Sequence, residues 1–261
     1  MSESGQWAVV TGASSGIGRA LALEFAGGGF HVLLTGRDLQ ALARVAEECT
    51  KRFHVQAETF TADLSDPEST DQLLGAISGQ PRDYAVLVNN AGFGIHGEFS
   101  GTDIASETGL LNVQLAAALK LTKAVLPGMI ARHNGRILNV GSVYCYAPVP
   151  FQSVYSACKA FLLSFSAAIR SELAGSGVTV TVFCPGITRT EFRSRAGIRE
   201  KNKASGMTAE AAARIAYEGT MRGIPVVIPG LANRLFVVLG KILPNSAFTG
   251  IVRYINHKRG Q

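Results

Sequence analysis

Short apolar runs, rich in β-branched residues, alternate with longer helical patterns along most of this chain. The runs are WAVVT (7–11), HVLLT (31–35), AETFTA (57–62), AVLVNN (85–90), RILNV (136–140), VTVTVF (178–183) and VVIP (226–229). Continuously apolar strands with helices between them are typical of a parallel sheet that is covered on both faces. The sequence therefore predicts an α/β fold with right-handed crossovers, in which ligands lie at the carboxyl ends of the strands.

The length of the chain, 261 residues, fits one large domain. The start, MSESGQWAVV, lacks a basic region followed by a long apolar core, and the later run LFVVLGKIL is interrupted by Lys241 and followed by Pro244. We therefore expect neither a signal peptide nor a membrane-spanning helix. The four cysteines are widely spaced, which predicts buried, reduced thiols in a cytoplasmic protein rather than metal ligands or disulfides.

The net charge of +6 is unevenly distributed. Residues 186–207 carry +4 and residues 233–261 carry +5, which leaves −3 for the rest of the chain. This distribution predicts two local basic features and no general nucleic-acid-binding surface. The first feature is either a solvated, mobile lid or a clamp for an anionic group of the substrate.

The stretch GSVYCYAPVPFQSVYSACKA (141–160) contains three tyrosines and one lysine. Tyr155 and Lys159 are four residues apart, so on a helix they share one face, whereas Tyr144 and Tyr146 have no such partner. A neighbouring cation lowers the pKa of a phenol from about 10, which would let Tyr155 exchange protons near neutral pH. The alternative is a packed ring beneath a solvated amine.

The first predicted strand leads into VVTGASSGIGRALALEF (9–25). Gly12, Gly16 and Gly18 allow a tight turn and close approach of a ligand, and the following helix directs free N–H groups at an anion such as a pyrophosphate. The spacing differs from the commonest dinucleotide fingerprint, so a simple strand-to-helix turn is the alternative.

Six motifs in order resemble those of the short-chain dehydrogenases/reductases. They are TGASSGIG (11–18), NNAG (89–92), Asn112, Ser142, YSACK (155–159) and PGITRT (185–190). The resemblance spans residues 6 to about 228 and implies a single Rossmann-type doubly wound parallel sheet. Residues 229–261 are an extension that resembles the C-terminal part of a DltE-like branch of this family.

The resemblance implies acid–base catalysis by four residues. Tyr155 would protonate the carbonyl oxygen or deprotonate the alcohol, Lys159 would lower its pKa and hold the nicotinamide ribose, and Ser142 would hydrogen-bond the substrate oxygen. Asn112 would support a water-linked proton path to Lys159. Taken alone, Ser142 could instead cap a turn, and Asn112 could bond nearby backbone.

A nicotinamide dinucleotide is the implied cofactor. Gly36 stands where family members that use NAD typically carry Asp, and Arg37 follows it, which favours NADP(H). Asp38 is expected to cap the next helix. The predicted cofactor residues are Gly12, Ser14, Ser15, Gly16, Ile17, Gly18, Arg37, Asp63, Leu64, Asn90, Ala91, Gly92, Tyr155, Lys159, Pro185, Gly186, Ile187 and Thr190.

The segments before Tyr155 and after Gly92 are expected to line the substrate pocket. Phe93, Val149, Phe151 and Phe192 suggest an apolar carbonyl or alcohol compound, and His96 is expected to be a solvated loop residue. The family resemblance also implies a homodimer or homotetramer. Its expected contacts are the helices of 104–131 and 151–174, where Leu111, Leu115 and Leu119 recur at helical spacing.

Two other functions fit the same residues: a protein that senses NADPH without turnover, and a peripheral membrane protein. Residues 231–261 combine apolar runs with five cations and no acid, a composition that suits the interface of an anionic membrane. We nevertheless expect this tail to close the substrate pocket or to pack on a partner subunit.

Overall fold

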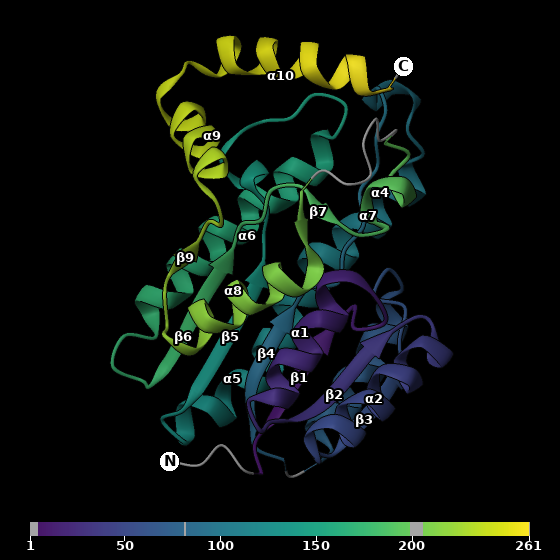
Figure 1. Ribbon diagram of the computed structural model, residues 1–261, viewed down its shortest axis with the longest axis vertical. Helices are drawn as coiled ribbons and strands as arrows, with labels where there is room; N and C mark the ends of the chain where they lie inside the picture. The colour runs from purple at the N-terminus through teal and green to yellow at the C-terminus, as the bar shows by residue number, and fades with distance from the viewer. Residues whose placement is uncertain (1–4, 81, 199–205, 261) are drawn as a thin grey trace.

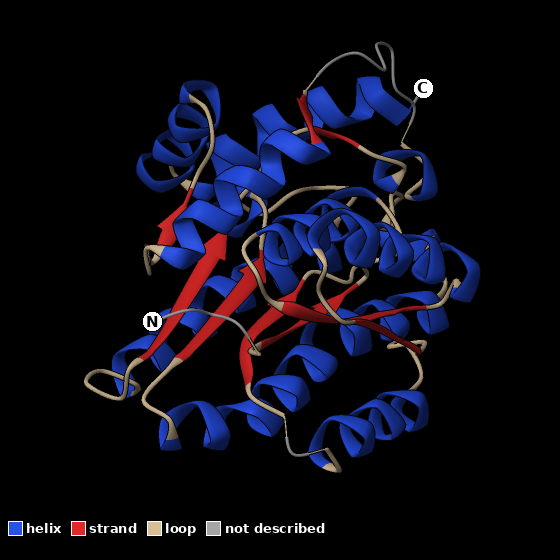
Figure 2. Cartoon of the chain, turned by 60° about the horizontal axis from the view of Figure 1, so that its bottom comes forward, coloured by secondary structure: helices blue, strands red, loops and turns tan. Residues whose placement is uncertain are grey.

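The computed structural model describes residues 5–80, 82–198 and 206–260, the last six of these in backbone only. Its core is a seven-stranded parallel sheet in the order β3-β2-β1-β4-β5-β6-β9, with helices on both faces (Figure 2). The strands are β1 Trp7–Thr11, β2 His31–Gly36, β3 Ala57–Thr61, β4 Tyr84–Asn89, β5 Gly135–Val140, β6 Val178–Phe183 and β9 Val226–Val227. The predicted doubly wound α/β fold is therefore confirmed.

The strand bounds differ little from those predicted, except for the last. Only Val226 and Val227 pair with β6, opposite Val182 and Phe183. Pro229 follows two residues later and has no N–H to extend the ladder. The chain therefore leaves the sheet at this point and enters the C-terminal extension.

Two helical layers cover the sheet because alternate strand residues point to opposite faces. The major helices are α1 Gly16–Gly27, α2 Leu39–Phe53, α3 Pro67–Ser78, α4 Ile104–Leu111, α5 Ala117–Ala131, α6 Ser153–Glu172 and α8 Ala209–Met221 (Figure 1). Val10 belongs to the core beneath α1, α2 and α8, whereas Val9 belongs to the core beneath α3 and α5.

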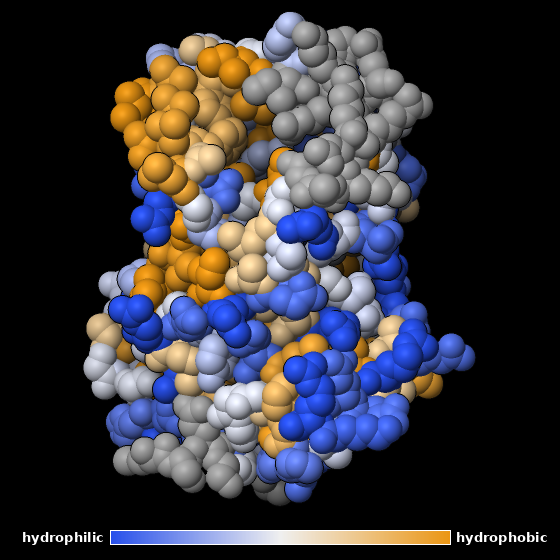
Figure 3. Space-filling view, in the orientation of Figure 1, coloured by the Kyte–Doolittle hydropathy of each residue, from blue (hydrophilic) through white to orange (hydrophobic). Residues whose placement is uncertain are grey.

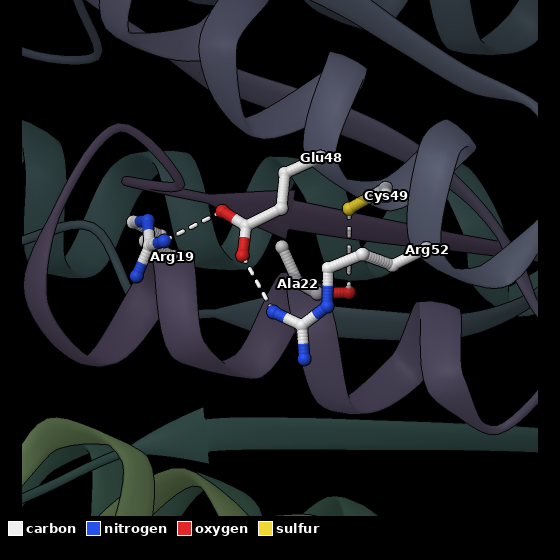
Figure 4. A network of polar contacts seen from close by, with 5 residues as sticks. All are labelled: Arg19, Ala22, Glu48, Cys49 and Arg52. Atoms are coloured by element: carbon white, nitrogen blue, oxygen red, sulfur yellow. Dashed lines mark hydrogen bonds and ion pairs between the residues drawn. The ribbon is translucent and has the colours of Figure 1, made fainter.

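Helix α2 is joined to α1 by a polar contact near the glycine-rich turn. Glu48 accepts hydrogen bonds from Arg19 of α1 at 2.5 Å and from Arg52 at 2.6 Å (Figure 4). Next to Glu48 in the sequence, the Cys49 thiol donates a hydrogen bond to the carbonyl of Ala22 at 4.0 Å. Exposed ion pairs contribute little individually, about 0–1 kcal/mol. Of the two pairs, Arg19–Glu48 links α2 to α1, and both helices border the cofactor region.

The predicted helix over 110–130 contains a π turn. The turn η2 (Asn112–Ala116) joins α4 to α5, and the Ala117 N–H donates to the carbonyl of Asn112. By length and hydropathy alone, the whole stretch Ile104–Ala131 would be able to cross a membrane. It packs instead on β4 and β5 beside α3, which gives its apolar side chains a protein environment.

Apolar side chains also face outward on the two helices expected to mediate self-association. Leu111 is exposed, and on α6 the ring of exposed Phe161 stacks on Phe165 at 5.7 Å. Leu115 and Leu119 are half-buried. Self-association through these faces stays a prediction.

The extension forms two helices, α9 Leu231–Ile242 and α10 Asn245–Gly260, above the carboxyl end of the sheet (Figure 1). Phe248 and Val252 of α10 are buried against Ala147 and Val149. Phe236 of α9 packs on the same cluster. The extension is thus attached by a small apolar core of its own.

Candidate active site

The turn between β1 and α1 brings backbone close to β4. A Cβ atom at position 18 would lie 2.1 Å from the carbonyl oxygen of Gly12 and 2.4 Å from Nδ2 of Asn90, so only glycine fits there. Asn90 fixes the turn further, because its Nδ2 donates to the carbonyl of Thr11 at 2.8 Å. The same amide group also faces the cavity described below, so Asn90 has a structural task as well as the predicted one.

The start of α1 is suited to an anion. Its N-cap residue, Ser15, makes no side-chain capping hydrogen bond to the first turn. The first N–H groups of a helix have no intrahelical acceptors, and the dipole there favours negative charge. With glycine at Gly12, Gly16 and Gly18, a pyrophosphate fits this turn.

A single large cavity of about 970 Å³ opens at the carboxyl ends of the strands. It is lined by every cofactor residue predicted from the sequence: Gly12, Ser14, Ser15, Gly16, Ile17, Gly18, Arg37, Asp63, Leu64, Asn90, Ala91, Gly92, Tyr155, Lys159, Pro185, Gly186, Ile187 and Thr190. Motifs from six parts of the chain therefore meet at one place.

Ser142, Tyr155 and Lys159 lie together on one wall of this cavity. Ser142 follows β5, and its Oγ accepts the N–H of Tyr144 at 3.2 Å, so its own O–H remains available to donate. Tyr155 and Lys159 come from α6 and are 8% and 5% exposed. The Lys159 ammonium donates to the carbonyl of Val140 at 2.8 Å and lies 5.5 Å from the centre of the Tyr155 ring.

Burial dominates the protonation of this pair. It raises the pKa of Tyr155 above its usual value, an effect that the Ser142 hydroxyl partly offsets. Burial also lowers the pKa of Lys159 to about 8. The pKa of Tyr155 in the cofactor-free chain is thus raised rather than lowered as expected, because burial is the largest cause and the Lys159 ammonium is directed at the carbonyl of Val140.

Asn112 does not line the large cavity. The side-chain Nδ2 of Asn112 donates to the carbonyl of Ser65 at 2.9 Å, and its backbone carbonyl accepts the Ala117 N–H across the π turn. A second cavity of about 10 Å³ lies between Lys159 and this helix, lined also by Val113 and Gln114. That is close to the space one water needs, roughly 10–15 Å³. A proton path from Lys159 would begin in this small cavity, and a role for the Asn112 side chain stays a prediction.

Two cations line the cavity near the end of β2: Arg37, which follows the strand, and Arg44 of α2. Asp38 is occupied as the N-cap of α2, where Oδ1 accepts the Ala41 N–H at 2.9 Å, as expected. Arg37 also lies 3.8 Å from Asp63. Burial raises the pKa of Asp63, but hydrogen bonds from Ser65 and the charge of Arg37 lower it overall.

The substrate side of the cavity is apolar, although not all the predicted residues contribute. Phe93 and Phe192 line it, and the ring of Phe192 lies 5.5 Å from that of Tyr155. Val149 and Phe151 are not among its lining residues: Val149 is buried beneath the C-terminal helices. Val149 packs instead with Phe248 and Val252 of the extension, whose position the sequence did not reveal.

His96 also differs from expectation, since it is half-buried on the cavity wall rather than solvated. Its ring stacks on Phe151 at 5.9 Å, and burial lowers its pKa. In the described part of the chain no hydrogen-bond partner reaches its buried Nε2. A neutral imidazole thus borders the substrate space.

Sequence reasoning missed several residues of the cavity wall, among them Arg44, Tyr144, Asn233 and Phe236. Arg44 follows Ala41 at helical spacing, and both side chains line the cavity. Asn233 and Phe236 share the inner face of α9 in the same way. A helical projection of 231–242 would have separated this inner face from the outer one.

The described part of the basic segment after Gly186 contains β7 (Thr188–Arg189), α7 (Phe192–Arg195) and β8 (Met207–Thr208). Arg193 and Arg195 line the cavity beside Glu191. The remaining cations predicted here, Arg199, Lys201 and Lys203, lie outside the described residues. The segment therefore borders the substrate space, whether as lid or as clamp.

A family model described as short chain dehydrogenase matches residues 6–201. The chain belongs to this family. The match covers the glycine-rich turn, the NNAG motif, Ser142, Tyr155 and Lys159. The family is one of oxidoreductases.

Several curated relatives are reductases. A "Very-long-chain 3-oxoacyl-CoA reductase" of Laccaria bicolor is 40% identical over 67% of this chain and 53% of its own length. A "Sulfoacetaldehyde reductase 2" of Chromohalobacter salexigens is 36% identical over 70% of this chain and 73% of its own. The chain spans about half the length of the 3-oxoacyl-CoA reductases that it matches.

Solved structures are similar over nearly the whole chain. A short-chain dehydrogenase from Sphingobium yanoikuyae in complex with NADPH is 32% identical, covers 95% of both chains and has a TM-score of 0.82. The "bulky-bulky ketone specific alcohol dehydrogenase" from Comamonas testosteroni is 27% identical over 95% of this chain and 93% of its own, with a TM-score of 0.78.

The geometry generates a direct prediction for Tyr155. Tyr155→Phe keeps the buried ring but removes the proton, so turnover should fall by roughly 10²- to 10⁴-fold, the usual contribution of general acid–base catalysis. Cofactor binding, followed by fluorescence titration, should persist. Tyr144→Phe and Tyr146→Phe are matched controls, and both should remain active. The lysine nearest Tyr146 is Lys241, 4.9 Å from its ring centre, so the second control also tests whether a nearby lysine alone makes a tyrosine catalytic. A near-normal kcat for Tyr155→Phe would contradict the assignment.

Proposed function

We propose that the chain is an NADP(H)-dependent reductase that converts the carbonyl group of a mainly apolar, acyl-type substrate into an alcohol. The observation that carries the proposal is the convergence of Ser142, Tyr155 and Lys159 with the full set of predicted cofactor residues on one cavity. The family supports oxidoreduction. The cofactor form, the substrate and the direction are our inference.

Two cations support NADP(H) over NAD(H). Arg37 and Arg44 both border the cavity at the end of β2, where the cofactor ribose is expected, and the nearest acid, Asp38, is occupied in capping α2. Guanidinium groups suit a 2′-phosphate through their planar set of donors. Asp38 also lines the cavity, but its Oδ1 caps α2, and Gly36 stands where family members that use NAD typically carry Asp.

A bound nicotinamide would supply the hydride. Ser142 donates its O–H to the carbonyl oxygen and orients it. Tyr155 then gives its phenol proton to that oxygen as the carbonyl carbon is reduced. The positive charge of Lys159 favours the phenolate that forms. Burial raises the pKa of Tyr155, so the phenol carries the proton that reduction of a carbonyl group requires.

The walls of the cavity support an extended apolar substrate. Phe93, Phe192 and Phe236 line the space beside Tyr155, and Phe236 comes from the extension. Arg193 and Arg195 border the same space and suit a phosphate-bearing carrier such as coenzyme A. Relatives named very-long-chain 3-oxoacyl-CoA reductase add weight to a 3-oxoacyl thioester.

Two alternatives to this proposal can be distinguished from it by what they would require of the cavity. A small anionic aldehyde would fit the sulfoacetaldehyde reductase relative, but it would leave most of the apolar wall unused. A cofactor-sensing protein without turnover would not need Tyr155 and Lys159 buried beside a substrate-sized space. The assignment of the extension to a DltE-like branch stays a prediction.

The cofactor proposal predicts a selective loss. Arg37→Ala and Arg44→Ala should each weaken NADPH binding by about 1.5–3 kcal/mol, the range for a hydrogen bond to a charged group, and leave NADH binding little changed. Arg222→Ala, at the distant end of α8, is a control of the same chemistry. Equal losses for both cofactors in a calorimetric titration would refute a 2′-phosphate site.

The substrate proposal is tested by chain length. With NADPH, a series of 3-oxoacyl-CoA thioesters should show kcat/KM rising with acyl length, because each buried methylene adds about 0.8 kcal/mol. Sulfoacetaldehyde and simple bulky ketones serve as comparison substrates, with nicotinamide absorbance as the readout. A preference for sulfoacetaldehyde, or no dependence on acyl length, would overturn this proposal.

A further inference from the structure

Helix α9 has an outward apolar face that neither the cavity nor the core uses. Its members are separated by helical spacing and are between 43% and 82% exposed: Leu231, Leu235, Val238, Leu239 and Ile242. Figure 3 shows this side of the molecule as a continuous hydrophobic surface over α9. Scattered exposed leucines need no explanation, but a contiguous face of this kind marks an interaction site.

The opposite face of α9 already has its partners. Phe236 and Asn233 line the cavity, and Val237 is buried. The helix is thus apolar on two sides, and only the inner side is explained by the predicted role as a pocket wall. The outer side needs an occupant of its own.

The charges around this face indicate what that occupant is. Arg234 and Lys241 lie on one flank of α9, and Arg253 is exposed on α10, next in the chain to the buried Val252. No Asp or Glu follows Glu218 in the sequence. Ile251 of α10 is also exposed. The occupant must therefore accept aliphatic side chains and carry negative charge.

We propose that the outer face of α9, with the adjoining residues of α10, docks on an anionic lipid bilayer. Leucine, valine and isoleucine side chains would enter the acyl–headgroup boundary while the cations meet the lipid phosphates. A second copy of the chain is less suitable, because an isologous contact would set these cations against themselves with no acid on the extension to pair with them. The sequence analysis favoured a pocket lid or a contact with a partner subunit, and of these a lid accounts for only the inner face.

Docking in this way would place the cavity wall formed by Phe236 directly behind the bilayer contact. An acyl substrate could then pass from the lipid phase to the cavity without crossing water. This second step rests on the proposed function, whereas the docking itself does not.

Sedimentation of the full chain with vesicles tests the docking. The protein should sediment with phosphatidylcholine vesicles that contain phosphatidylglycerol, should bind vesicles of phosphatidylcholine alone roughly tenfold less, and should be released by salt. Leu235→Glu/Leu239→Glu should lower binding to the anionic vesicles by roughly tenfold or more. Leu39→Glu/Phe99→Glu changes two exposed apolar residues elsewhere by the same charge and should bind as the parent does.

Three results would overturn the inference: no binding of the parent to anionic vesicles, equal binding by the two double variants, or a lower mass of Leu235→Glu/Leu239→Glu in light scattering without lipid. The last would mean that a second copy covers the face. Circular dichroism establishes that each variant is folded. Vesicle binding by a protein without reductase activity would uphold the docking and refute the proposed function, so the two fail separately.

Discussion

The removal of the Lys159 ammonium and the Tyr155 phenol from water is the constraint on which this site depends. A buried cation must be hydrogen-bonded, and here the acceptor is the carbonyl of Val140 at the end of β5. That contact links α6 to the end of β5, next to Ser142. Burial, rather than this hydrogen bond, lowers the pKa of Lys159 to about 8. Such a group destabilises the fold relative to an apolar residue, which is typical of sites shaped for chemistry.

The C-terminal extension shows how the same fold acquires a particular substrate space. Phe248 and Val252 attach it to Ala147 and Val149, and this attachment brings Phe236 to the cavity. The apolar wall, the cations of the segment after Gly186 and the outward face of α9 then lie at one end of the molecule. A long acyl substrate, a charged carrier and a lipid surface are chemically compatible with this arrangement.

Much of the fold was predictable because it follows from local periodicity. Apolar runs located the strands, and Asp38 marked the start of α2. The π turn at Asn112 was not predictable, because no residue in NVQLA (112–116) marks a change in the helix. The site was predictable where backbone geometry restricts residue type, as at Gly18. Prediction from the sequence failed for properties that depend on burial. The pKa of Tyr155, the position of His96 and the packing of Val149 all depend on which residues cover these side chains.

The most direct test of this account is a titration of the two buried groups in the cofactor-free protein. With selectively ¹³C-labelled lysine and tyrosine, NMR signals assigned through Lys159→Met and Tyr155→Phe would report each proton separately. The account predicts that Lys159 titrates near its lowered pKa of about 8 and that Tyr155 remains protonated beyond the usual phenol value. A Lys159 pKa of about 10.4 together with an ordinary phenol would mean that both groups are hydrated, and would contradict the buried acid–base site.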